Sequence, residues 1–167
     1  MSLNHRAIST PVSILTTLAM LISFCPSAFA KKPEKVFKGR IILSKSRFPS
    51  RFKTDKAFVK HMKKVDTKSI YASEDGTWSF EYMVFPKKRV GTIQAAVTFY
   101  DITSGRKKLV NTFSFYMRNP KDKILNGYAS LSKDKNFRPN RKYLMVFSRG
   151  YGQAPLAMTK FALFPKK

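Results

Sequence analysis

The sequence predicts an all-β protein, a single antiparallel β-sandwich of about seven to eight strands with one short helix inserted near residues 55–65. Short apolar runs of period two recur between turn signals from Val36 onward, as in successive strands of such folds. Hydrophobic residues make up 43% of the 167 residues and aromatic residues 14%, so the chain can bury a core and differs from disordered chains. The sequence has no self-similarity at periods of 20 to 50 residues, which favours one all-β domain over a repeat array.

The first 30 residues have the three parts of a secretory signal peptide. Arg6 precedes an apolar stretch at residues 12–24, and Ala28-Phe29-Ala30 follows as a cleavage site of the A-x-A kind. The stretch is too short to span the ~30 Å of membrane hydrocarbon, and no second apolar segment follows it. We therefore expect cleavage after Ala30 and an exported, soluble basic domain at residues 31–167, either periplasmic or secreted.

The single cysteine, Cys25, lies within this predicted leader. The bulky Phe24 before it disfavours lipid attachment, so we expect a product without an anchor and without disulfides. About 140 residues can bury enough surface to fold without such cross-links.

The first strand is predicted at residues 36–43, and the segment after it changes to the period of a helix. Thr54 can cap this helix, in which Phe58, Met62 and Val65 recur at i, i+4 and i+7. At 100° per residue the lysines of the segment fall on the opposite side. We expect a short amphipathic helix with a cationic outer face.

Two hairpins are predicted in the middle of the chain. Asp75-Gly76 would close a tight turn between residues 70–73 and the alternating segment at residues 78–84. The second hairpin joins residues 93–99 to residues 109–117, both of period two, through a turn at Thr103-Ser104-Gly105.

The last two strands are predicted at residues 143–147 and 156–164. The first of them has no polar residue, as expected of a central strand covered on both faces. The glycines of Gly150-Tyr151-Gly152 precede a strand and not a helix, so this segment is a hairpin loop and not a dinucleotide-binding loop.

Just before the strand at residues 143–147, the chain has the pattern apolar-x-Pro-x-x-x-Tyr, formed by Phe137, Pro139 and Tyr143. This pattern resembles the tyrosine corner of immunoglobulin-like and fibronectin type III sandwiches. The resemblance implies that the phenol group binds upstream backbone at the corner between two sheets. It concerns the fold and no specific family, and the chain lacks the cysteine pair of antibody domains. Such a likeness implies no chemistry.

The sequence offers little to a catalytic or metal site, and we expect no catalytic residue, no cofactor and no metal. His61 is the only histidine after the leader, and its place beside Met62 favours packing over a role as a base. Ser148 lacks the first glycine of the nucleophile elbow. Most acids have a basic neighbour, which lowers a carboxyl pKa and disfavours a general acid; the exception is Glu81, in the middle of a strand.

The charge of the chain is its most distinctive property. Lys and Arg number 33 against 9 Asp and Glu, a net charge of +24, whereas solubility needs a magnitude of only ~2 to 8. The basic residues concentrate at residues 51–64, 87–89 and 106–108. Within the helix, Lys56, Lys60 and Lys64 follow at i, i+4 and i+8 with no acid between them on that face, although each like-charged pair costs ~0.2 to 0.5 kcal/mol.

This pattern has two interpretations: a solvated face in a generally basic protein, and a surface that binds a polyanion. The leading hypothesis is an exported, non-enzymatic module for an anionic cell-envelope polymer, a glycan or lipid head groups, with non-specific nucleic-acid binding ranked lower. The candidate anion-binding residues are Lys56, Lys60, Lys63, Lys64, Lys87, Lys88 and Arg89.

A protein-binding or adhesive module that uses a sheet edge or loops is the alternative, and a hydrolase with an unfamiliar site ranks third. A steep loss of binding with salt would favour the polyanion, and an acidic cleft with two close carboxylates would favour the hydrolase.

Overall fold

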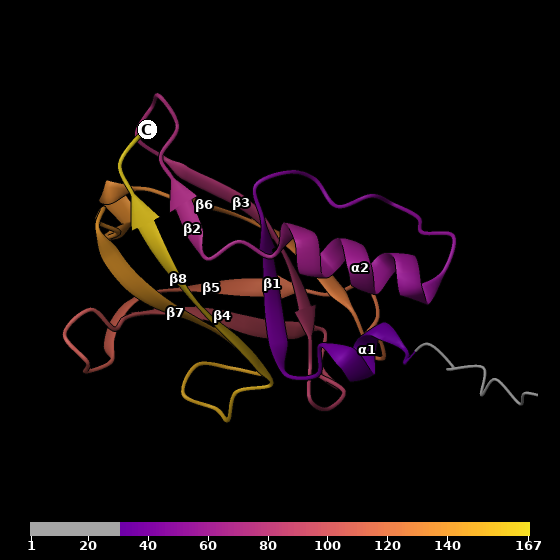
Figure 1. Ribbon diagram of the computed structural model, residues 1–167. Coiled ribbons are helices and arrows are strands. Elements are labelled where there is room, and N and C mark those ends of the chain that lie inside the picture. Colours follow the sequence, from indigo (N-terminus) through magenta and orange to yellow (C-terminus); the bar gives the residue numbers. More distant parts are fainter. Residues whose placement is uncertain (1–30) are drawn as a thin grey trace, which may run out of the picture.

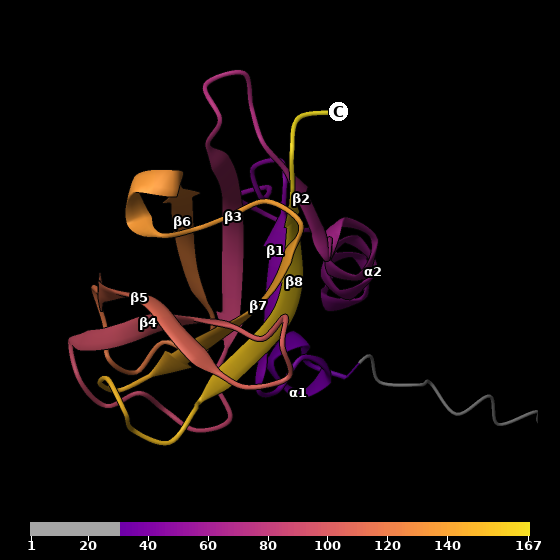
Figure 2. The same cartoon turned by 90° about the vertical axis from the view of Figure 1, so that its left-hand side faces the viewer.

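In the part of the chain that the structure describes, eight strands form one sheet that curls until its two ends face each other (Figures 1 and 2). The computed structural model describes residues 31–167, so the predicted leader lies outside the described residues. The strands are β1 (Arg40–Ser44), β2 (Ser69–Tyr71), β3 (Trp78–Phe85), β4 (Gln94–Asp101), β5 (Lys108–Tyr116), β6 (Leu125–Leu131), β7 (Arg141–Ser148) and β8 (Ala157–Phe164).

The strand order is β5-β4-β7-β8-β1-β3-β6, and β2 also pairs with β8. Figure 2 shows the part made of β1, β3 and β6 crossing the part made of β4, β5 and β7, and the core lies between them. Across this core the rings of Tyr82 on β3 and Phe115 on β5 lie 6.3 Å apart. The predicted fold class, a β-sandwich of seven to eight strands, is confirmed. The sheet is mixed and not purely antiparallel as predicted, because β8 pairs in parallel with both β1 and β2.

The corner before β7 has the predicted tyrosine geometry. The Tyr143 hydroxyl accepts a hydrogen bond from the N–H of Arg138 at 2.8 Å and donates one to the carbonyl oxygen of the same residue at 3.1 Å. The tyrosine ring is buried between Phe137 and Phe161, with centroid distances of 5.4 and 5.8 Å. Together with the curled sheet, this corner defines an immunoglobulin-like fold.

A second, smaller core lies on the outer face of β1 and β3. Helix α2 (Asp55–Val65) begins as predicted, because the Thr54 side chain accepts a hydrogen bond from the N–H of Ala57 at 3.1 Å. Its apolar side, with Met62 fully buried, packs against Phe85 of β3 and Phe37, which follows the short helix α1 (Pro33–Val36). Figure 1 shows α2 across this face of the sheet.

Two of the predicted strands differ from those observed. The first was expected at residues 36–43 but begins at Arg40, because α1 occupies the preceding residues and Gly39, with φ of +78°, turns the chain into the strand. The turn at Gly76 forms, and the Ser73 N–H bonds the Thr77 carbonyl oxygen at 2.8 Å. The strand before it nevertheless pairs with β8 in parallel register and not with β3, so the predicted first hairpin is wrong.

Strand β6 had no counterpart among the predicted strands. Its sequence lacks the period-two apolar alternation, because Gly127 occupies an inward position opposite Tyr82 in the β3–β6 register. A Cβ atom at Gly127 would overlap the Tyr82 ring, so the phenol fills the place of the missing side chain. The apolar alternation of β6 was therefore not visible in its sequence, because the Tyr82 ring of β3 packs where Gly127 has no side chain.

Candidate anion-binding surface

The four predicted helix lysines form an exposed row on α2, which we call the helix face: Lys56, Lys60, Lys63 and Lys64. They lie opposite the side that packs into the second core through Phe58, Met62 and Val65. Because the apolar side of α2 is committed to this core, the helix has no apolar face left to insert into lipid. The packing of the helix thus turns the helix face toward solvent.

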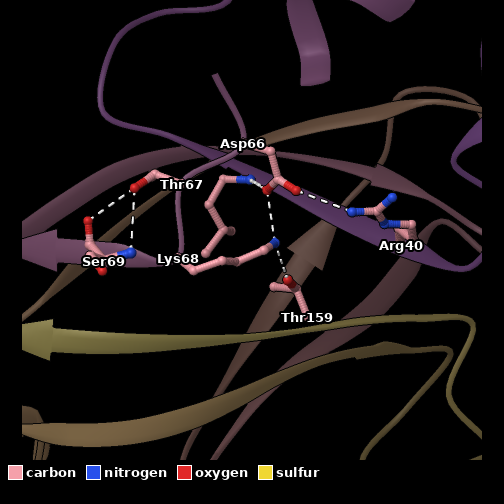
Figure 3. Close-up of polar contacts among 7 residues, drawn as sticks. Arg40, Asp66, Thr67, Lys68, Ser69 and Thr159 are labelled. Atoms are coloured by element: carbon pink, nitrogen blue, oxygen red, sulfur yellow. Dashed lines mark hydrogen bonds and ion pairs between the residues drawn. The ribbon is translucent and has the colours of Figure 1, made fainter. Parts of the chain in front are cut away.

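The end of α2 is tied to the sheet by a carboxylate network (Figure 3). Asp66 follows the helix, and its carboxylate accepts from Arg40 at 3.2 Å, from the Lys68 ammonium at 2.8 Å and from the N–H of Leu43 at 3.4 Å. Lys68 also donates to the Thr159 hydroxyl at 2.8 Å, which connects the network to β8. The cations that support the fold here are thus paired with a carboxylate.

The seven predicted anion-binding residues, by contrast, are not paired with acidic side chains within residues 31–167. Six ion pairs occur within residues 31–167, and none of them includes a residue of the helix face or of Lys87, Lys88 and Arg89. Their charges are therefore balanced only by solvent ions. Such a surface attracts anions and releases counterions when it binds them.

The loop after β3 takes part in a cavity of about 210 Å³ that the sequence did not reveal. Antiparallel pairing of β1 with β3 places Arg40 opposite Phe85, so the residues before β1 meet those after β3. Lys35 and Lys38 thereby join Lys87, Lys88 and Arg89 around the cavity. Lys123 reaches the same place through the pairing of β6 with β3, in which Leu125 lies opposite Val84. No local signal could have identified Lys35, Lys38 and Lys123, because strand pairing assembles them from separate segments.

The structure does not bring the helix face and the loop at residues 87–89 into one cluster. Helix α1 lies between α2 and this loop in both cartoon views (Figures 1 and 2). The basic segment at residues 106–108 ends the turn between β4 and β5 and begins β5, on the side of the molecule far from α2 (Figure 1). The cationic surface thus consists of separate patches on a rigid framework.

Beside the turn between β4 and β5, Asp101 is held as an ion. Its carboxylate accepts from Arg141 at 2.8 Å and from the N–H of Thr103 at 2.8 Å. Burial raises the pKa of Asp101, but the hydrogen bonds from Thr103 and Arg141 outweigh it, so the pKa lies below its usual value. The hydrogen bond between Asp101 and Arg141 also raises the pKa of the Arg141 guanidinium.

The residues considered for catalysis occupy structural positions. The His61 ring lies 5.2 Å from that of Phe52, and the Ser148 hydroxyl donates to the carbonyl oxygen of Gly150 at 2.7 Å. Glu81 accepts from the N–H of Phe48 at 2.9 Å.

Within residues 31–167 no group of three or more His, Cys, Asp or Glu side chains has the geometry of a metal site. The acids Glu34 and Asp122 share the 210 Å³ cavity with six basic residues, so this cavity is not an acidic cleft. Among the described residues no helix has the length and apolarity needed to cross a membrane.

The class that the fold defines is an immunoglobulin-like β-sandwich, here with a lysine-rich helix packed on one face. No family model matches the chain, and no curated protein matches it.

Two solved structures are similar to the chain in fold. One is an immunoglobulin-like protein from Pseudomonas aeruginosa, with a TM-score of 0.39, 11% identity, and coverage of 76% of this chain and 94% of that one. The other is a β-glucosidase from Listeria innocua in complex with gluconolactone, with a TM-score of 0.35, 9% identity, and coverage of 76% of this chain but 16% of the enzyme. Neither likeness assigns a function to this chain.

Proposed function

We propose that this protein is an exported, non-enzymatic binding module that holds anionic cell-envelope or glycan polymers on its lysine-rich surface. One observation carries the proposal. The helix face displays four exposed lysines that take part in no ion pair within residues 31–167, on a helix whose apolar side is buried in the second core. A helix needed only for packing gains nothing from four uncompensated like charges.

The spacing of these lysines suits a linear polyanion. Residues four apart on a helix are separated by about 6 Å along its axis, so Lys56, Lys60 and Lys64 form a row of regularly spaced charges. Each anionic group that meets a lysine releases condensed counterions, and this contribution needs no sequence-specific geometry. A polymer with phosphate or carboxylate groups in every unit can engage the whole row.

The compartment determines which polyanion is available. The predicted leader at residues 1–30 favours export, and outside the cytosol the accessible polyanions are wall polymers, phosphorylated glycans and lipid head groups. Released nucleic acid would bind through the same charges without sequence preference.

The proposal is tested by reversing charge on the helix face with the double variant Lys60→Glu, Lys64→Glu. Binding to cell-envelope fractions and to a model polyanion such as polyphosphate is measured at low and high salt. We expect affinity to fall by about tenfold or more and the dependence on salt to flatten, because four charge units leave the contact face. The free energy of unfolding should change by only a few tenths of a kcal/mol, since both positions are exposed and new pairs form with Lys56 and Lys63.

A matched control changes the same charge elsewhere. The double variant Arg106→Glu, Lys107→Glu lies in the exposed turn between β4 and β5, and its effect on affinity should be much smaller. Equal losses of affinity in the two variants would show that the helix face contributes only through the general positive charge of the protein. Parental affinity in the helix variant, with the helix intact by circular dichroism, would contradict the proposal.

A second candidate function, a protein-binding or adhesive module, is favoured by the two ends of the sheet. Within residues 31–167, strands β5 and β6 each have one unpaired edge, and Tyr116 on β5 is 70% exposed. An extended segment of another protein could add to such an edge through backbone hydrogen bonds. Binding of this kind would barely respond to salt, which separates it from the polyanion complex.

A further inference from the structure

The cavity beside α1 combines an excess of positive charge with a small, defined volume. Six basic residues line it, and of its two acids Glu34 is paired with Lys123 at 3.6 Å, whereas Asp122 takes part in no ion pair within residues 31–167. Its volume of about 210 Å³ is below the ~300 to 1,000 Å³ of sites for drug-sized ligands. The cavity therefore suits a small anionic group and not a large organic molecule.

The loop that supplies three of the cations is held at several points. The Arg149 guanidinium donates to the carbonyl oxygens of Val90 at 2.8 Å and Arg89 at 3.2 Å, and Val90 itself is fully buried. The N–H of Lys87 bonds the carbonyl oxygen of Leu156 at 2.8 Å. A loop fixed in this way loses little further freedom when a ligand binds, which favours affinity.

The position of the Lys87 side chain is also restricted. A Cβ atom at Gly39 would lie 2.7 Å from Cε of Lys87, so the aliphatic part of this lysine packs directly on the glycine backbone. The absence of a side chain at Gly39 therefore leaves room for the Lys87 stem beside the turn that leads into β1. Lysines act as point charges toward an oxyanion, and the arginine fork can bind two of its oxygens.

We propose that this cavity is a binding site for a single phosphate group of the monoester kind, held by Lys35, Lys38, Lys87, Lys88 and Arg89. The inference goes beyond the proposed function, because the cavity is separate from the helix face and would recognise one phosphate group, either at the end of a polymer or in a small ester. A phosphomonoester is close to dianionic at neutral pH and presents three strong acceptor oxygens. These properties match several converging cations better than a single carboxylate does.

The test measures binding of inorganic phosphate to the full chain by calorimetry and by NMR. We expect saturable binding at one site, with the largest chemical-shift changes at the residues that line the cavity. A hexose phosphate, and phosphatidylcholine vesicles with and without phosphatidic acid, then distinguish the sources of the group. Binding of the hexose phosphate alone indicates a glycan or soluble ester, and binding that depends on phosphatidic acid indicates a lipid.

Paired variants separate the cavity from the general charge. The double variant Lys88→Gln, Arg89→Gln removes two exposed cations at the cavity and should weaken phosphate binding by about tenfold or more. The double variant Lys60→Gln, Lys64→Gln removes the same charge from the helix face and should change it by less than about twofold, because distant exposed charges are screened. Unchanged thermal midpoints in both variants show that the fold is intact.

Two outcomes overturn the inference: no saturable binding of phosphate, or equal weakening in the two variants. Failure of the proposed function is a separate result. If polyphosphate binding depends on the helix face while phosphate does not bind the cavity, the inference fails and the proposed function stands. If phosphate binds at the cavity but polyanions do not depend on the helix face, the cavity is a site for a small phosphate ester and the proposed function fails.

Discussion

Tyr143 illustrates how one polar group stabilises a corner of the sandwich. Its ring is buried among aromatic neighbours, while its hydroxyl group both accepts from and donates to the backbone of Arg138. Burial raises the pKa of this phenol, so the hydroxyl stays protonated and keeps its donor at all ordinary pH values. The sequence predicted this contact because all its partners lie within seven residues, Phe137 to Tyr143.

Removal of that hydroxyl should have a measurable cost. In Tyr143→Phe the N–H and carbonyl group of Arg138 lose their partner, and we expect a destabilisation of ~1 to 3 kcal/mol without loss of the fold. Denaturant unfolding followed by tryptophan fluorescence provides the measurement. Tyr151→Phe, at a position that is 60% exposed, is the matched control and should leave the midpoint unchanged. Coincident midpoints for Tyr143→Phe and the parent would show that the corner contributes nothing.

At the scale of the elements, strands are joined by contacts that the pattern of each strand does not show. Strand β7 pairs with β4 on one side and β8 on the other, as predicted for a central strand. The ends of β4 and β7 are also joined by the Asp101–Arg141 ion pair at 2.8 Å. The partners are sequence-distant and neither strand is periodic in charge, so only the register of Asp101 with Tyr143 brings them together.

The lowered pKa of Asp101 makes the stability contribution of this pair depend on pH. A carboxyl group with a lower pKa in the folded state stabilises the fold above its unfolded pKa of about 3.9. This contribution is lost as the pH falls through the folded pKa, where the native carboxylate also becomes protonated. Because Arg141 is half exposed, we expect Asp101→Asn to cost only about 1 kcal/mol at pH 7.

The measurement is the difference in unfolding free energy between Asp101→Asn and the parent from pH 7 to pH 2. It should be largest near neutral pH and shrink steadily below pH ~4. Asp134→Asn removes an exposed acid that takes part in no ion pair within residues 31–167 and is the control. A difference that is independent of pH would show that ionisation of Asp101 does not contribute.

At the scale of the whole molecule, a framework with two cores carries a large excess of positive charge on its surface. The curled sheet encloses the main core, and the second core holds α2 against β1 and β3. Acids are placed where cations support this framework, as at Asp66, while the helix face has no ion pair within residues 31–167. A stable sandwich thus displays its excess positive charge in patches of constant shape, which is the physical basis of the proposed binding function.

The proposed export predicts the N-terminus of the native protein. Mass spectrometry of the product isolated from its source should find Lys31 as the first residue, because Ala28-Phe29-Ala30 is the expected cleavage site. The cell fraction that contains this species identifies the compartment. An intact Met1, or a lipid on Cys25, would contradict the export proposal.

The sequence by itself determined the features that depend on near neighbours: the helix with its Thr54 cap, the strands of strict period two, the corner at Tyr143 and the excess of charge. The helix, the strands and the corner are each encoded within a short segment, and the charge follows from composition alone. The tertiary structure alone decided the parallel partner of β2, the existence of β6 and the gathering of Lys35, Lys38 and Lys123 with the loop after β3. Periodicity shows which face of a segment is buried, but strand pairing between distant segments decides its neighbours, so sites assembled across strands become visible only in the folded chain.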